Sequence, residues 1–164
     1  MVLSRGIAVA SICAVLMASG SAAQRLDKQD KQVDVSIALK VAGQTFTFNG
    51  KGEANHEPAA YIYGAKAEVW KVEGRNAQGA ASLTLWRPAA GSKDMISLYV
   101  TTGGKSYSVN TVGTGGNAEG SGKVTFTPAG PGGTFTIDAT AANGARITGT
   151  LKCGAFTAIV AEGG

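Results

Sequence analysis

Apolar and polar side chains alternate with a two-residue period through most of this chain, from Gln32 onward. The clearest case is Val33–Val41, where Val, Ile or Leu occupies every odd position. Successive side chains of a β-strand point to opposite faces, so this period predicts a strand with one buried face. Similar segments recur between turns of Gly, Pro, Asn and Asp, and a helical period is almost absent. The sequence therefore predicts an all-β domain.

About ten short strands are expected, joined mostly as hairpins. A turn at Ala42-Gly43 is expected to lead from the first strand into a second that contains Phe46 and Phe48. The further strands are expected at Ala67–Glu73, Ala80–Trp86, Met95–Thr101, Lys105–Thr111, Lys123–Thr127, Thr134–Thr140, Ala145–Cys153 and Ala155–Ala161. Such a series predicts either an antiparallel β-sandwich or a closed meander barrel. Alternation alone does not distinguish the two.

The register of the central hairpins follows from matching apolar residues across strands. Placing Leu83 opposite Leu98 also sets Leu85 against Ile96 and, on the other face, Trp86 against Met95. A two-residue turn at Gly103-Gly104 then sets Val100 against Tyr107 and Leu98 against Val109, which continues the same apolar face. These three strands are predicted to form a meander.

A three-residue loop, Ala142 to Gly144, is predicted between the next pair of strands, with Gly144 in the left-handed conformation. It pairs Phe135 with Leu151 and directs Cys153 toward the core. A free, buried thiol is therefore expected at Cys153. The alternatives are an intermolecular disulfide or a reactive thiol. A bend or bulge is expected at Gly154, where the parity of the apolar face shifts.

The N-terminal residues follow the plan of a secretory signal peptide. Arg5 precedes an apolar run of about Gly6 to Met17, and Ser21 and Ala23 are small residues suited to signal peptidase. The run is too short for a membrane-spanning helix, and Cys13 lies in the wrong context for lipidation. We expect a signal peptide at 1–23, a charged flexible leader at 24–32 and one β domain at 33–164. The protein is expected to be exported, to the periplasm or the extracellular space, with no membrane span after processing.

Charge and composition disfavour several classes of partner. The formal net charge is +4, and the Lys and Arg residues are scattered rather than clustered, so no nucleic-acid footprint is expected. Aromatic residues make up only 7% of the chain, and the second strand faces carry Thr, Ser and Lys. This composition disfavours an outer-membrane barrel, which needs aromatic girdles and an apolar outer band.

No catalytic, metal or cofactor site is predicted. His56, the only histidine, is expected in an irregular, solvated loop beside Glu53 and Glu57. This spacing matches no metal or nucleophile-base signature. The stretch Gly113–Ala118 fits a loose dinucleotide pattern but precedes a strand rather than a helix, so it is expected to be a strand connection.

Aromatic residues are the most suggestive candidates for ligand binding. Trp86 and Tyr99 are expected on the face opposite the apolar one, and Trp70, Tyr61 and Tyr63 are further candidates. An exposed ring offers a large contact area at little entropic cost. The alternative is that these rings only pack against neighbouring residues.

The functional hypothesis is a non-catalytic exported domain that acts through surface or groove binding, as a monomer or weak homo-oligomer. Its partner would be a protein, a glycan or a small apolar ligand. One alternative is a small-ligand carrier in a meander barrel, and another is a hydrolase dependent on carboxylates or His56. A filament subunit that adds the strand Val33–Val41 to a neighbour is a further possibility.

The targeting prediction is tested by the mass of the mature protein. We expect cleavage between Ala23 and Gln24, so the intact mass of protein purified from its own host should match a chain that begins at Gln24. N-terminal sequencing is the control. A chain that retains residues 1–23 would contradict the prediction.

Overall fold

The computed structural model describes residues 32–112 and 118–158, which form ten β-strands. They are β1 (Gln32–Val41), β2 (Gln44–Ile62), β3 (Ala65–Asn76), β4 (Gly79–Pro88), β5 (Met95–Thr102), β6 (Lys105–Asn110), β7 (Ser121–Ala129), β8 (Gly132–Thr140), β9 (Arg146–Cys153) and β10 (Thr157–Ala158). No helix long and apolar enough to cross a membrane occurs among these residues. The predicted all-β class is confirmed.

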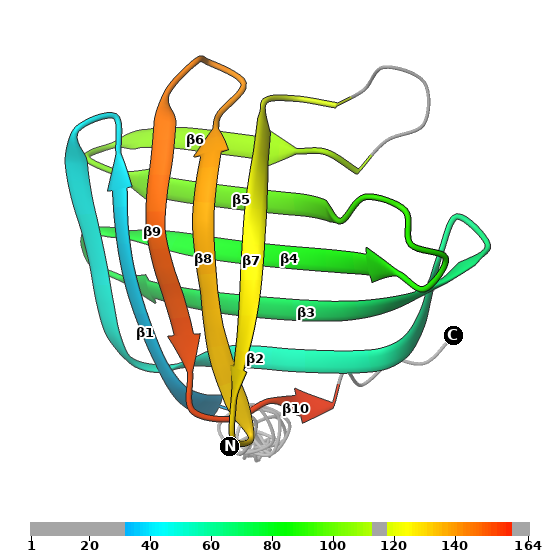
Figure 1. Cartoon of the computed structure of the whole chain (residues 1–164). Helices are drawn as coiled ribbons and strands as arrows, with labels where there is room; N and C mark the ends of the chain where they lie inside the picture. The colour runs from blue at the N-terminus through cyan, green and yellow to red at the C-terminus, as the bar shows by residue number, and fades with distance from the viewer. Residues whose placement is uncertain (1–31, 113–117, 159–164) are drawn as a thin grey trace, which may run out of the picture. The chain divides into compact units, whose positions relative to one another are not determined.

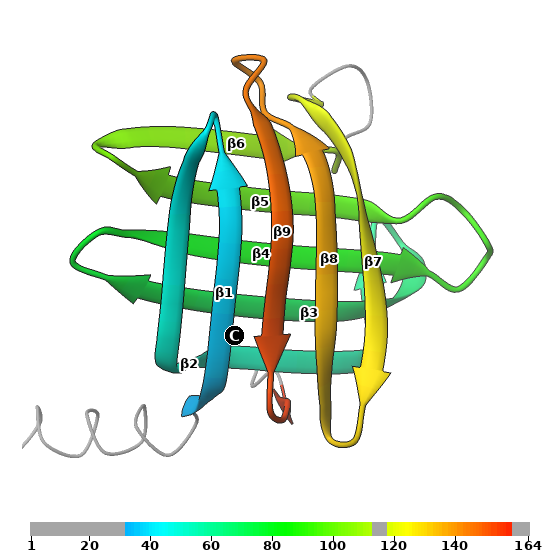
Figure 2. The same ribbon diagram turned by 60° about the vertical axis from the view of Figure 1, so that its left-hand side comes forward.

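The strands form one antiparallel sheet in the order β6-β5-β4-β3-β2-β1-β9-β8-β7, with β10 added to β2. This sheet folds over itself into two layers, in which β3 to β6 run across β1, β9, β8 and β7 (Figures 1 and 2). The sheet is nearly closed into a barrel. Its ends meet at one point, where the backbones of Asn110 and Glu119 exchange hydrogen bonds of 2.7 and 2.8 Å. Of the two predicted architectures, the structure therefore favours the barrel.

Strand β2 is much longer than expected and belongs to both layers. It pairs with β1 through Glu53 and with β3 from Glu53 onward. The irregular loop that was predicted around His56 is therefore wrong, because residues 49–58 lie within β2. A Cβ at Gly52 would clash with the carbonyl oxygen of Glu73, so the glycine permits close approach of the backbones at the corner between the layers.

The predicted hairpin registers are confirmed. Leu83 pairs with Leu98, and Val100 pairs with Tyr107. Phe135 pairs with Leu151, and the three-residue loop places Gly144 at φ +82°. These registers are local, so matching of apolar faces across short loops is enough to fix them.

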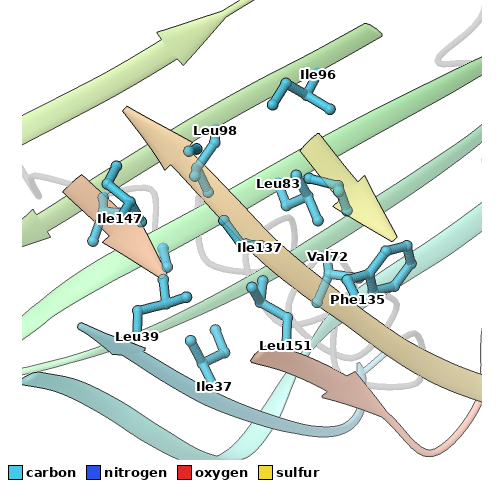
Figure 3. Close-up of a cluster of buried hydrophobic side chains, with 14 of the residues drawn as sticks. Ile37, Leu39, Val72, Leu83, Ile96, Leu98, Phe135, Ile137, Ile147 and Leu151 are labelled. Atoms are coloured by element: carbon cyan, nitrogen blue, oxygen red, sulfur yellow. The ribbon is translucent and has the colours of Figure 1, made fainter. Parts of the chain in front are cut away.

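The core lies between the two layers. Ile37, Leu39, Leu83, Leu98, Phe135 and Leu151 are among the side chains that fill it (Figure 3). They come from both layers, and each is at most 1% exposed. Because a one-residue slip would turn a strand's whole apolar set toward solvent, this packing also holds the register.

The C-terminal part of the chain differs from the prediction. An antiparallel strand was expected at Ala155–Ala161, but β9 ends at Cys153 and the described part of β10 runs parallel to β2. The parity change at Gly154 therefore marks the point where the chain leaves the sheet. The signal peptide, Cys13, the leader before Gln32, most of the Gly113–Ala118 motif and the residues after Ala158 lie outside the described residues.

Cys153 is free and buried on the core side of β9, with 7% of its surface exposed. Its Sγ lies 3.7 Å from the carbonyl oxygen of Gly133. Burial raises the pKa of this thiol, because desolvation disfavours the thiolate; the Gly133 contact opposes the shift.

Cys153 should therefore react slowly with iodoacetamide in the folded protein. The thiolate is the reactive form, and both its low population and its burial limit the rate. We expect labelling below pH 8 to become at least about a hundredfold faster after denaturation. Mass spectrometry over time measures both rates. Equally fast labelling of native and denatured protein would contradict the burial of this side chain.

Candidate functional site

An open pocket of about 430 Å³ lies between the ends of β2, β3 and β4 and the turn that joins β7 to β8. We call it the aromatic pocket. It is lined by His56, Glu68, Trp70, Arg87, Phe126, Pro128, Gly130, Pro131, Gly132 and Phe156.

The position of this pocket follows from how the layers overlap. Strands β3 and β4 extend beyond β7, the edge strand of the other layer (Figures 1 and 2). Along β4 the inward positions run from the buried Leu83 and Leu85 to the half-buried Arg87. Along β3 they run from Val72 back through Trp70 to Glu68. The inner face thus turns from apolar to polar where the overlying layer ends.

Trp70 forms the centre of the pocket wall and is only 2% exposed. The His56 ring, from β2, stacks on it at a centroid distance of 5.1 Å and an interplanar angle of 7°. The guanidinium of Arg87, from β4, lies 5.1 Å from the centroid of the Trp70 ring, within cation–π range. Two polar side chains from the flanking strands are therefore positioned by one buried indole.

Both polar side chains also have an acidic partner. Nε2 of His56 donates a hydrogen bond of 2.8 Å to Oε1 of Glu68. Nη2 of Arg87 lies 3.1 Å from Oδ2 of Asp94, and Nε lies 3.3 and 3.4 Å from its two oxygens. All four side chains are partly exposed, so solvent screens these pairs and each contributes modestly to stability.

Two phenylalanine rings beside Trp70 complete the aromatic lining of the pocket. Phe126 of β7 lies 5.0 Å from Trp70 and 5.9 Å from Phe156, between ring centroids. Phe156 is held in place because its backbone N–H donates to the carbonyl of Pro131 at 3.0 Å. The next residue, Thr157, hydrogen bonds to the side chain of Asn55 in β2 at 2.8 Å. The short C-terminal segment thus fixes one side of the pocket.

A second pocket, of about 390 Å³, adjoins the first along β7. It is lined by Lys93, Asp94, Ile96, Gly122, Lys123 and Val124, and we call it the lysine pocket. Asp94 lines this pocket while its ion-pair partner Arg87 lines the aromatic pocket. The Arg87–Asp94 pair therefore lies at the boundary between them.

The five aromatic residues proposed from the sequence do not converge. Only Trp70 reaches the aromatic pocket, and it is buried rather than exposed on the sheet. Trp86 and Tyr99 lie on the outer face, where Trp86 is opposite Met95 and Tyr99 is 47% exposed. Tyr61 and Tyr63, at the tip of the β2–β3 hairpin, are 67% and 64% exposed.

The prediction of a solvated loop histidine is wrong, because His56 lies within β2, half-buried between Trp70 and Phe156. From the sequence, Glu68 and Asp94 were only two of several candidate carboxylates, and Arg87, Phe126 and Phe156 were not recognised as site residues. A signal was available for two of them: Glu68 shares its parity with the inward Trp70, and Arg87 with Leu85. Charged residues at inward positions near a strand end indicate an uncovered part of the inner face.

The aromatic pocket is lined by aromatic, proline and glycine residues together with His56, Glu68 and Arg87. No Ser, Thr, Cys or Lys side chain lines the aromatic pocket in the part of the chain that the structure describes. Within that part, no group of three His, Cys, Asp or Glu side chains is placed to hold a metal ion. What the pocket offers is apolar ring surface beside fixed hydrogen-bonding groups.

The two tryptophans provide a test of this geometry, because the chain contains no others. In W86F all tryptophan emission comes from the buried Trp70, and we expect a blue-shifted spectrum and weak quenching by acrylamide. In W70F the emission comes from the half-buried Trp86 and should be quenched more strongly. Thermal melts establish that both variants fold. Stronger quenching of W86F than of W70F would place Trp70 outside the core.

Comparison of the chain with protein-family models, with curated proteins and with solved structures finds no match.

Proposed function

We propose that this protein is a non-catalytic binding domain that holds a small, partly apolar ligand in the aromatic pocket. The observation that carries the proposal is the convergence of aromatic walls and two fixed polar pairs around a pocket of about 430 Å³. Ligand pockets typically enclose about 300–1,000 Å³ and combine apolar walls with a few placed polar groups.

The site is also rigidly supported. His56, Trp70 and Arg87 come from three neighbouring strands, and Phe126 comes from a fourth. Side chains on regular strands lose less entropy on binding than side chains on loops, because their backbone is already fixed. A preorganised pocket of this kind favours recognition of a small molecule.

The pocket at the side of the barrel is a better ligand site than the barrel centre. Between the layers, Phe135, Ile137 and Leu151 fill the interior with close-packed side chains (Figure 3). We therefore propose a carrier whose ligand lies beside β7 rather than in the centre of the barrel. The proposal includes the export predicted from residues 1–23.

A hydrolase is the second candidate, and the observation that favours it is the hydrogen bond of 2.8 Å between His56 and Glu68. A carboxylate that orients an imidazole is a common feature of general-base catalysis. The partner is Glu68 rather than Glu53 or Glu57, which lie beside His56 in the sequence. Full turnover of any detected activity in an H56A variant would remove this candidate.

Native mass spectrometry of protein purified from its own host tests the binding proposal. We expect an added mass that is lost on unfolding. F126A removes one pocket wall and should retain at least about tenfold less ligand, as expected for loss of a buried aromatic contact. The matched control, Y99A, alters the outer face and should retain ligand normally.

Two results would contradict the proposal. Loss of ligand in Y99A but not in F126A would move the site to the outer face of the sheet. Absence of any bound mass, together with no change in Trp70 fluorescence across a library of small molecules, would argue against small-ligand binding altogether. Thermal melts of both variants show whether a loss of ligand is only a loss of folding.

A further inference from the structure

We propose that the ligand is an amphiphile with a carboxylate head group, which binds Arg87 at the boundary of the two pockets while its apolar chain lies along β7. This inference rests on the proposed binding function and adds the chemical class of the ligand. It is carried by the position of both pockets beside β7, by the charged residues that line them and by the contacts of Arg87.

The two pockets follow one another along the inner face of β7, and together we call them the groove. Val124 lines the lysine pocket and Phe126 lines the aromatic pocket, and both occupy inward positions of β7. On the opposite side, Ile96 pairs with Leu85, which pairs with Trp70. Ile96 and Trp70 therefore give each pocket an apolar residue on the side opposite β7, where the apolar chain of a ligand could pack.

The charges at the boundary favour a negative ligand. Three cationic side chains, Arg87, Lys93 and Lys123, and the carboxylate of Asp94 line this part of the groove. Arg87 pairs with Asp94, and Lys123 lies opposite Asp138 in the pairing of β7 with β8. The other carboxylate nearby, Glu68, is occupied by its hydrogen bond with His56. An anionic head group would balance the surplus of positive charge, whereas a cationic one would increase it.

Asp94 shows that a carboxylate fits against Arg87 at this position. It contacts the guanidinium through Nε and Nη2. A guanidinium has five N–H donors in a planar arrangement suited to carboxylates. A ligand carboxylate would therefore share the guanidinium with Asp94 or replace it.

The edge strand itself disfavours a peptide as the occupant. β7 carries Lys123 and Pro128, and lysine and proline on an edge strand oppose the addition of another strand. A ligand that needs no backbone pairing fits this groove better than an extended peptide.

Three probes of equal chain length test the head group: octanoate, octanol and octyltrimethylammonium. Binding to mature W86F is followed by Trp70 fluorescence and confirmed by calorimetry. We expect octanoate to bind at least tenfold more tightly than octanol, and the trimethylammonium probe to bind most weakly. R87M should remove the preference for octanoate over octanol. D94N should tighten octanoate binding, because it removes the competing carboxylate.

R146M is the matched control, since Arg146 also pairs with an aspartate, Asp138, but lies outside both pockets. It should bind octanoate like the parent. If R87M fails to fold, D94N and the probe series still test the proposal. Equal affinity for octanoate and octanol would overturn the head-group assignment while the binding function stands. Binding of none of the probes, with a host ligand still present, would overturn the amphiphile class alone.

Discussion

The fold depends on the continuity of one long strand through the corner of the barrel. β2 is 19 residues long and serves as the partner of β1 in one layer and of β3 in the other. The corner is tight, because a Cβ on Gly74 would lie 2.5 Å from the ring of Phe48. The bend in β2 determines the angle at which the two layers cross. Every later strand then adds to one of these two layers. The placement of the core and of the groove along β7 both follow from this corner.

The same constraint explains why a polar site occurs in an otherwise apolar inner face. Layers that cross do not cover each other completely, so the ends of β3 and β4 project beyond the edge strand β7. Inward side chains there cannot be buried by another strand. Glu68 and Arg87 occupy these positions, and each has a partner of opposite charge or a hydrogen-bond donor. The groove is thus the part of the inner face that the other layer of the sheet does not cover.

The sequence was sufficient for the parts of the structure that are local. The register of Leu83 with Leu98 follows from a short connection and matching apolar faces. The crossing of the layers was not predictable. Gly50, Gly52 and Pro58 are residues typical of a loop, and nothing in the sequence shows that they lie in a continuous strand that turns a corner. His56 was consequently misplaced. Phe126 and Phe156 lie 30 positions apart in sequence and meet only because the C-terminal segment is fastened to β2 through Thr157. Such contacts depend on the closed topology, which alternation does not specify.

The internal pairing of the site also determines how a ligand could gain affinity. Among the described residues, every buried side-chain nitrogen or oxygen atom has a hydrogen-bond partner. A ligand bond to Nε or Nη2 of Arg87 is made in competition with Asp94, which already accepts hydrogen bonds from both atoms. The net gain must come largely from the apolar contacts with Phe126, Phe156 and Val124, at about 25 cal/mol per Å² of buried apolar surface. In such a groove the ion pair sets which head group is accepted, and the length of the apolar chain sets how tightly the ligand is held.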